Sequence, residues 1–217
     1  MNLAIVIAAV GLLALVLFFE RRQRRTFYLP LKTALSLLLI AAALVQPRPL
    51  ASYFHFLMAG LVCCLAGDVL LALPGQKAFR LGLVAFLVGH LAYVLAFVRF
   101  SSPRGVGFWA ATVAVLAGSA FVFRWLEPFL GRMRGAVLAY VAAISTMLIA
   151  ALAVAGNAGL APSGRALVLL GALCFYLSDL FVARQRFIAP AFANRLYGLP
   201  LYYIGQFLLA FSVGRIL

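Results

Sequence analysis

Long apolar runs separated by short polar segments make up the chain. Each run has roughly 15 to 22 residues, the length that an α-helix needs to cross a hydrocarbon core of about 30 Å. The shortest run requires local thinning of the bilayer or burial by neighbouring helices. We therefore expect an all-α polytopic membrane protein with a single transmembrane domain, residues 1–217. Its eight predicted helices lie at about residues 2–19, 31–45, 52–73, 81–100, 106–123, 135–155, 165–183 and 196–216.

Composition supports this class, with 67% hydrophobic and only 10% charged residues. A net charge of +14 would suggest a nucleic-acid partner in a soluble protein, but here the cations gather in short loops between helices. We therefore expect membrane lipids and no nucleic acid as partners, and the bacterial cytoplasmic membrane as the location. Cys63, Cys64 and Cys174 lie inside apolar runs, which indicates packing residues and no metal site.

The basic loops orient the predicted bundle. Thirteen of the 18 Lys and Arg residues lie in or beside the loops after the first, third, fifth and seventh helices, with Lys32 counted in the first. Because cytoplasmic loops carry an excess of Lys and Arg, these loops are expected in the cytoplasm and both termini outside. The helices at 52–73 and 165–183 then both run from the outside inward.

Two of the four acidic residues, Asp68 and Asp179, lie inside apolar runs. A carboxylate in hydrocarbon is costly unless it is protonated, paired or in contact with water, so such residues mark functional sites. Asp68 precedes Pro74 by six residues and Asp179 precedes Arg184 by five, which puts both carboxyls about 7–9 Å from the cytoplasmic helix ends. This shared depth, with the similarity of GDVLLAL to SDLFVAR, favours two parallel four-helix repeats.

Helical spacing brings further polar and aromatic side chains to the faces that carry the acids. If these faces converge, they enclose an aromatic-walled cavity that opens toward the cytoplasmic leaflet. The candidate catalytic residues are Asp68 and Asp179, and the supporting or substrate-binding candidates are Lys32, His90, Tyr93, Tyr140, Ser178, Tyr202, Tyr203 and Gln206.

The supporting residues also have structural interpretations. An intramembrane His or Gln is often an interhelical hydrogen bond worth about 0.6 kcal/mol, so both interpretations stay open for His90 and Gln206. The tyrosines of the fourth and eighth helices are more readily explained by packing, and Lys32 by snorkelling toward the nearby basic loop. Two acids at one depth on different helices are harder to explain as packing, and function is favoured for them.

Taken in order, these elements resemble the lysoplasmalogenase family, the YhhN-like integral membrane proteins. The resembling elements are Lys32, GDVLLAL around Asp68, the F-x-x-G-H-x-x-Y run from Phe86 to Tyr93, Tyr140 with Met147, the Ser178-Asp179 pair and Gln206. Thr33 departs from the pattern, because the family usually has proline after the lysine. The resemblance implies cleavage of the vinyl-ether bond of a lysoplasmalogen, or a related lysolipid, to a fatty aldehyde and a glycerophospho-headgroup, with the two aspartates as candidates for general acid and base.

The residues suit that chemistry. Hydrolysis of an enol ether requires a proton delivered to carbon, which generates an oxocarbenium ion, and then water to trap it. A protonated carboxyl and a carboxylate provide such a pair, and two carboxyls in an apolar site can share a proton near neutral pH. No cofactor or metal is required. Lys32, with Arg80 and Arg184 at the same helix ends, is placed to meet a phosphate.

Other functions remain open on the sequence alone. A proton-coupled carrier or a lipid-binding membrane protein would use the same Asp pair, and an intramembrane aspartyl protease also has two aspartates on different helices. Both acids lie away from the predicted bilayer midplane, which argues against a carrier. The Tyr-Asp and Gly-x-Gly-Asp contexts that such proteases use are absent from the sequence.

Overall fold

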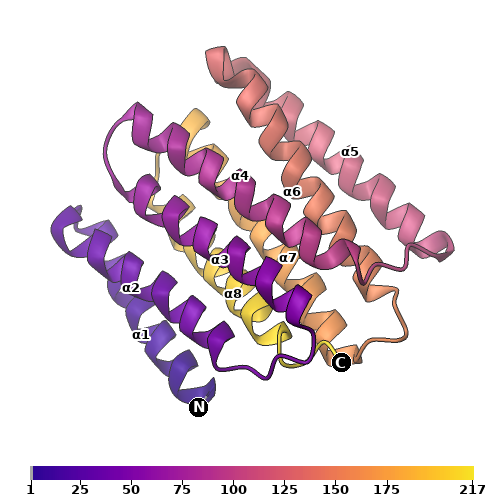
Figure 1. The fold of residues 1–217 in the computed structure, drawn as a ribbon. Helices are drawn as coiled ribbons and strands as arrows, with labels where there is room; N and C mark the ends of the chain where they lie inside the picture. Colours follow the sequence, from indigo (N-terminus) through magenta and orange to yellow (C-terminus); the bar gives the residue numbers. More distant parts are fainter. Residues whose placement is uncertain (1) are drawn as a thin grey trace.

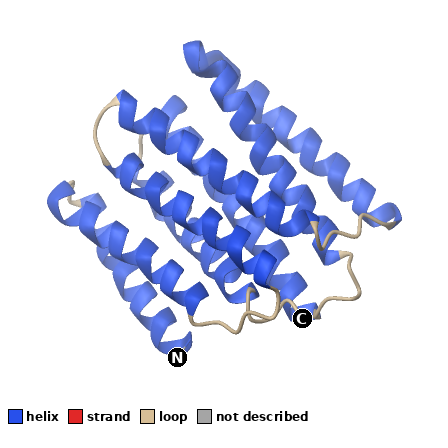
Figure 2. Ribbon diagram, in the orientation of Figure 1, coloured by secondary structure: helices blue, strands red, loops and turns tan. Residues whose placement is uncertain are grey.

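The chain folds into helices joined by short connections (Figures 1 and 2). The structure is a computed structural model that describes residues 2–217, and no strand occurs within that range. The α-helices are α1 (Asn2–Arg21), α2 (Arg25–Leu44), α3 (Ala51–Ala72), α4 (Gln76–Val98), α5 (Gly105–Leu130), α6 (Arg134–Ala155), α7 (Pro162–Ala183) and α8 (Phe192–Ser212). A 3-10 turn, η1 (Gly131–Met133), precedes α6, and a π-helical turn, η2 (Arg184–Ile188), follows α7.

Several helices extend beyond the apolar runs that predict them. α2 begins at Arg25, ahead of the expected start at residue 31, and continues through Pro30 in its second turn. α5 continues past residue 123 to Leu130, with Pro128 near its end. A charged residue ends an apolar run but not a helix, because its side chain is solvated where the helix leaves the hydrocarbon. A proline close to a helix end removes only one backbone hydrogen bond.

The surface of the bundle is that of an integral membrane protein. Six segments of the described chain are long and apolar enough to cross a membrane; α5 and α6 count together as one of them, and α8 is not among them. Large apolar side chains such as Leu3, Val106 and Phe121 are exposed, at 73%, 86% and 73%. A soluble domain rarely leaves such residues in contiguous exposed patches, whereas lipid covers them without cost.

Two helical hairpins, α3–α4 and α7–α8, form the centre of the bundle, with α1 and α2 on one side and α5 and α6 on the other (Figure 1). α2 packs against α3 and α8, and α6 packs against α7 and α4. Glycines permit close backbone approach in both hairpins: a Cβ on Gly89 would lie 3.2 Å from the carbonyl oxygen of Gly60, and one on Gly205 would lie 2.8 Å from that of Gly171.

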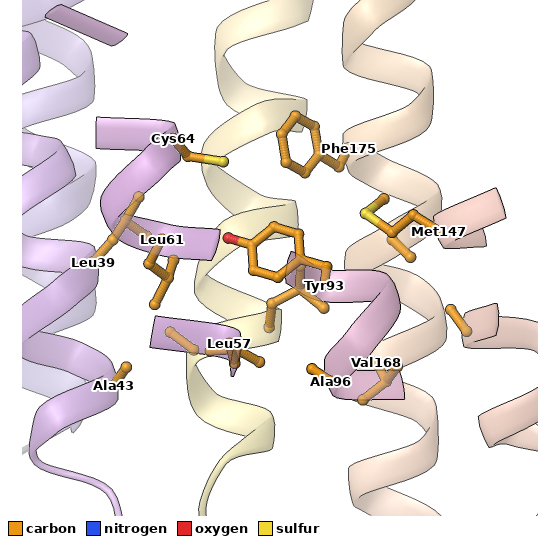
Figure 3. Close-up of a cluster of buried hydrophobic side chains, with 14 of the residues drawn as sticks. Leu39, Ala43, Leu57, Leu61, Cys64, Tyr93, Ala96, Met147, Val168 and Phe175 are labelled. Carbon is orange, nitrogen blue, oxygen red and sulfur yellow. The ribbon is translucent and has the colours of Figure 1, made fainter. Parts of the chain in front are cut away.

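The packed core lies between these hairpins and contains large aromatic side chains. Tyr93 is fully buried among Leu57, Leu61 and Phe175, as Figure 3 shows, and its hydroxyl donates a hydrogen bond to Gln206 Oε1 at 2.6 Å. The core extends along the bundle, and a second buried cluster of Leu126, Leu130, Met133 and Val137 lies between α5 and α6. The polar residues of interest lie toward the end of the bundle where the connections α1–α2, α3–α4, α5–α6 and α7–α8 are found and from which both termini are remote (Figure 1).

Candidate active site

Asp68 and Asp179 line one cavity. Each lies four residues before the last residue of its helix, α3 or α7, so the two carboxyls share a depth in the bundle. The cavity has about 1100 Å³ of empty space, counted with the part open to the outside. Of the residues predicted from the sequence, it is lined by Lys32, Asp68, Tyr140, Ser178, Asp179 and Tyr202. The other four, His90, Tyr93, Tyr203 and Gln206, lie behind its wall and are fully or almost fully buried.

Most of the cavity wall is apolar. α4, α5, α6 and η2 contribute aliphatic and aromatic side chains that continue from the acids toward the α5 side of the bundle. The apolar lining includes Leu71, Phe79, Leu83, Phe86, Val122, Leu126, Val137 and Phe187. A cavity with a few convergent polar groups in an apolar wall is the usual form of a small-molecule site.

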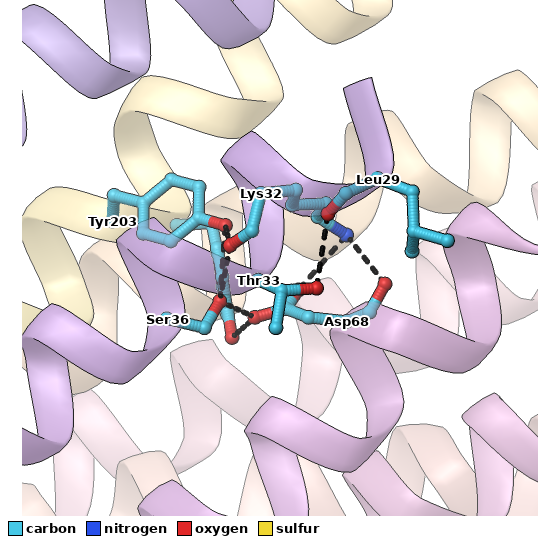
Figure 4. A network of polar contacts seen from close by, with 7 residues as sticks. Leu29, Lys32, Thr33, Ser36, Asp68 and Tyr203 are labelled. Atoms are coloured by element: carbon cyan, nitrogen blue, oxygen red, sulfur yellow. Dashed lines mark hydrogen bonds and ion pairs between the residues drawn. The ribbon is translucent and has the colours of Figure 1, made fainter. Parts of the chain in front are cut away.

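Asp68 is held by polar partners on both of its carboxyl oxygens (Figure 4). Its Oδ1 pairs with Lys32 Nζ at 2.9 Å, and its Oδ2 accepts hydrogen bonds from Ser36 Oγ at 2.6 Å and Tyr202 OH at 2.7 Å. The side chains of Lys32 and Asp68 are only 4% and 2% exposed. A buried ion pair with these additional donors is an ionised carboxylate fixed in one orientation.

Lys32 therefore has a different position from the one expected at the membrane surface. Its ammonium also donates to the backbone oxygen of Asp68 at 3.3 Å, and the side chain points into the bundle. The cation is occupied by Asp68, so neither snorkelling nor a direct phosphate contact accounts for its place. Tyr203 supports the same cluster, with its hydroxyl 3.2 Å from Ser36 Oγ and 3.4 Å from the Lys32 carbonyl oxygen.

Asp179 is held much less tightly. Within residues 2–217 its carboxyl accepts a single hydrogen bond, from Tyr140 OH to Oδ2 at 2.6 Å. Its side chain is 15% exposed and faces the cavity. The neighbouring Ser178 does not assist, because its hydroxyl donates to the Phe175 carbonyl oxygen of its own helix at 2.7 Å. Asp179 thus retains free lone pairs toward the cavity.

His90 stands beside Asp179 with its tautomer fixed. Its Nδ1 lies 2.7 Å from the backbone oxygen of Phe86, and since a carbonyl only accepts hydrogen bonds, Nδ1 carries the proton. In the neutral ring Nε2 is then an acceptor. This nitrogen is buried, has no hydrogen-bond partner in the described chain and lies 3.9 Å from Asp179 Oδ2. The ring packs between Tyr140 and Phe175, at centroid distances of 5.2 and 4.6 Å.

Three residues of the site were not predicted from the sequence. Ser36 binds Asp68 and lies one turn after Lys32, a spacing at which its role could have been foreseen. Asn194 and Arg195, at the start of α8, line the cavity, where the sequence suggested only a basic loop. Asn194 is 2% exposed and is fixed by Gln185 and the Ala189 carbonyl oxygen, and it accepts a hydrogen bond from Arg184. No group of three or more His, Cys, Asp or Glu suited to a metal occurs in residues 2–217.

The fold and site define a class: an all-helical membrane protein with one buried and one partly buried carboxyl in one largely apolar cavity. The model of the YhhN family matches residues 27–213, which include every candidate site residue. The chain therefore belongs to the YhhN family, and the resemblance noted in the sequence is confirmed.

Named relatives agree with this assignment. Proteins named lysoplasmalogenase from Mycobacterium tuberculosis and Mycobacterium bovis are each 33% identical over 178 residues, which cover 79% of this chain and 63% of theirs. The human lysoplasmalogenase TMEM86B is 32% identical over 190 residues, covering 88% of this chain and 77% of its own. The chain thus spans somewhat less than two thirds of the length of the mycobacterial relatives. No solved structure matches it.

Proposed function

We propose that this chain is a membrane-embedded hydrolase that cleaves the vinyl-ether bond of a lysoplasmalogen or a related lysolipid. The observation that carries the proposal is the pair Asp68 and Asp179 in one largely apolar cavity. Support comes from membership of the YhhN family and from the relatives that bear the name lysoplasmalogenase. The products are a fatty aldehyde and a glycerophospho-headgroup.

The reaction needs an acid and a water molecule. A proton from the acid adds to the alkenyl carbon remote from oxygen, and the double-bond electrons form the new C–H bond. This leaves an oxocarbenium ion at the carbon bonded to oxygen. Water adds there and loses a proton to the base, which gives a hemiacetal. The hemiacetal then breaks its bond to the glycerol oxygen, so that one water is consumed and one aldehyde and one glycerol hydroxyl are formed.

Asp179 is the residue we assign as the acid. It faces the cavity, accepts one hydrogen bond within residues 2–217 and lies in apolar surroundings, where a neutral carboxyl costs less than a charged one. His90 Nε2, 3.9 Å away, is an acceptor that a protonated Asp179 can face or that a bridging water can reach. We infer that His90 orients the Asp179 proton and passes protons to and from it.

Asp68 is assigned the ionised role. Its pairing with Lys32 and its two hydroxyl donors keep it a carboxylate, whose charge faces the cavity where the oxocarbenium ion forms. A fixed negative charge in an apolar site stabilises a developing cation without reorganisation. Tyr202, which bonds Asp68 and also lines the cavity, is placed to hold the attacking water against that carboxylate.

The apolar wall suits the rest of the substrate. The alkenyl chain would lie against Phe79, Val122, Leu126 and Phe187, on the side where α5 contributes to the cavity. For the membrane arrangement we propose eight spans in two parallel repeats, with both termini outside and the site toward the cytoplasm. The equivalent packing of α2 on α8 and of α6 on α4 supports the repeat, and the basic loops at the site end support the orientation.

The test is mass spectrometry of lipids incubated with purified protein in D₂O. We expect an alkenyl lysophospholipid to give an aldehyde with one deuterium on the carbon next to the carbonyl, because the acid delivers a solvent-derived proton to carbon. The matched alkyl lysophospholipid, which has no double bond to protonate, should remain intact. Transport of intact lipid across proteoliposomes with no aldehyde would overturn the proposal and favour a carrier.

A further inference from the structure

A second cavity adjoins the one that contains the aspartates. It has about 450 Å³ of empty space and lies at the same end of the bundle, among the end of α1, the start of α2, the end of α3 and the start of α8. Its polar lining residues are Glu20, Gln23, Arg24, Arg25, Tyr28 and Arg195, and Leu71 to Leu73 close the α3 side. Leu71 and Arg195 line both cavities, so the two spaces meet at these residues.

The second cavity is strongly basic, unlike the first. Three arginines face a single acid, Glu20, whose Oε1 lies 3.3 Å from Arg195 Nε. The two side chains are 19% and 25% exposed, and this contact does not meet the geometry of a hydrogen bond, since Arg195 Nε has no hydrogen-bond partner in the described chain. Arg195 is thus a half-buried guanidinium in a loose ion pair, with donors left for another anion.

The position of Arg195 is nevertheless well defined. It follows Asn194, which forms hydrogen bonds with Arg184 and Gln185 of η2 and with Ala189 in the segment between η2 and α8. Leu71 and Ala72 lie three and four residues beyond Asp68 on α3, about 5–6 Å along the helix axis, and Leu73 follows the helix end. A glycerol backbone spans a similar separation between its ether oxygen and its phosphate.

We propose that Arg195, with Arg24 and Arg25, forms the subsite for the phosphate of a lysophospholipid headgroup. A guanidinium binds phosphate through paired N–H donors, which the loose contact with Glu20 leaves available. Binding then exchanges Glu20 for phosphate at Arg195 while the chain enters the apolar cavity beside the acids. This inference rests on the proposed function, because it assumes that one lipid occupies both cavities.

The experiment measures binding of a lipid that cannot be cleaved. The probes are a 1-O-alkyl lysophosphatidylethanolamine, the corresponding alkylglycerol without phosphate, and inorganic phosphate, each titrated against the full-length protein by native mass spectrometry. We expect Arg195→Gln to weaken binding of the lysophospholipid by about 10- to 100-fold and that of the alkylglycerol by at least tenfold less. Glu20→Gln should strengthen lysophospholipid binding, because it removes the competing acid.

Controls separate the alternatives. Arg132→Gln makes the same charge change on an exposed residue at the same end, outside both cavities, and should leave lysophospholipid binding unchanged. If Arg195→Gln does not fold, the exposed pair Arg24→Gln and Arg25→Gln carries the test. Equal weakening for both lipids would overturn the proposal, as would inorganic phosphate that binds without displacing the lysophospholipid. The lipid titrations and the phosphate competition both measure binding and need no turnover. Absence of aldehyde release would therefore contradict the proposed reaction but not this phosphate subsite.

Discussion

Asp68 and Asp179 occupy matching places in the two halves of the chain, yet their surroundings differ. Each acid follows a helix-packing glycine by eight residues, Gly60 on α3 and Gly171 on α7, and each meets a helix from its own half, α2 or α6. Asp68 has a cation and two hydroxyl donors, whereas Asp179 has one hydroxyl donor and a histidine at 3.9 Å.

This difference is the basis of the two roles that we propose for the acids. A carboxylate that is paired with a cation and hydrogen-bonded by two hydroxyls keeps its orientation, so it can serve as a fixed charge. A carboxyl with one donor that faces the cavity is free to deliver a proton to a bound substrate. If the two halves of the chain arose from one repeated unit, Asp68 gained a lysine partner in one half, and Asp179 in the other half did not.

The largest expected effect comes from removing the free acid. Asp179→Asn should lower kcat for aldehyde release by about 10²- to 10⁴-fold, because the amide cannot donate a proton to carbon. The melting temperature should change little, since Asp179 makes one hydrogen bond and no close ion pair. Glu127→Gln, which removes a partly exposed carboxylate paired with Arg134 at the same end of the bundle, is the control. A rate within tenfold of the unmodified protein would exclude Asp179 as the acid.

Removing the cation that pairs with Asp68 should instead lower the stability of the protein. Lys32→Met leaves Asp68 buried without its cation, and we expect a loss of about 3–5 kcal/mol in the free energy of unfolding. The double variant Lys32→Met with Asp68→Leu should recover most of that loss but remain inactive. Denaturation in detergent measures the first effect and aldehyde release the second, with exposed Lys77→Met as the control. A stable Lys32→Met variant would mean that Asp68 is neutral and that the roles of the two acids need to be exchanged.

A smaller loss of kcat is expected from replacing His90, which lies beside Asp179. His90→Gln should lower kcat by about 10- to 100-fold with little change in KM, because the residue orients a proton and does not contact the headgroup. His55, the other histidine, is exposed near the opposite end of α3, so His55→Gln is a matched control. A rise in KM with kcat unchanged would place His90 in substrate binding and remove it from proton transfer.

The sequence predicted the helical membrane fold class and the shared depth of the two acids, because apolar runs and isolated charges within them are local features. It did not predict the Lys32–Asp68 ion pair or the place of Arg195 between two cavities. Such contacts depend on how each helix is rotated about its axis. In this chain several helices are apolar on most of their circumference, so the pattern specifies that rotation weakly. Only packing against neighbours, through glycines such as Gly89 and Gly205, determines which face turns inward.

The smallest effects should come from replacing the two tyrosines that donate hydrogen bonds to the acids. Which of the two variants loses more kcat tests the difference between Asp68 and Asp179. Tyr140→Phe removes the one hydrogen bond that Asp179 accepts within the described part of the chain and should lower kcat about tenfold, because the carboxyl loses its orientation. Tyr202→Phe removes one hydroxyl at the attacking water but leaves Asp68 with Lys32 and Ser36, and it should lower kcat by about threefold. Tyr176→Phe, which removes a hydroxyl bonded to Ser119 at the same cavity, controls for the loss of a phenol from the wall. If Tyr202→Phe has the larger effect, the water held at Asp68 limits the rate and the orientation of Asp179 does not.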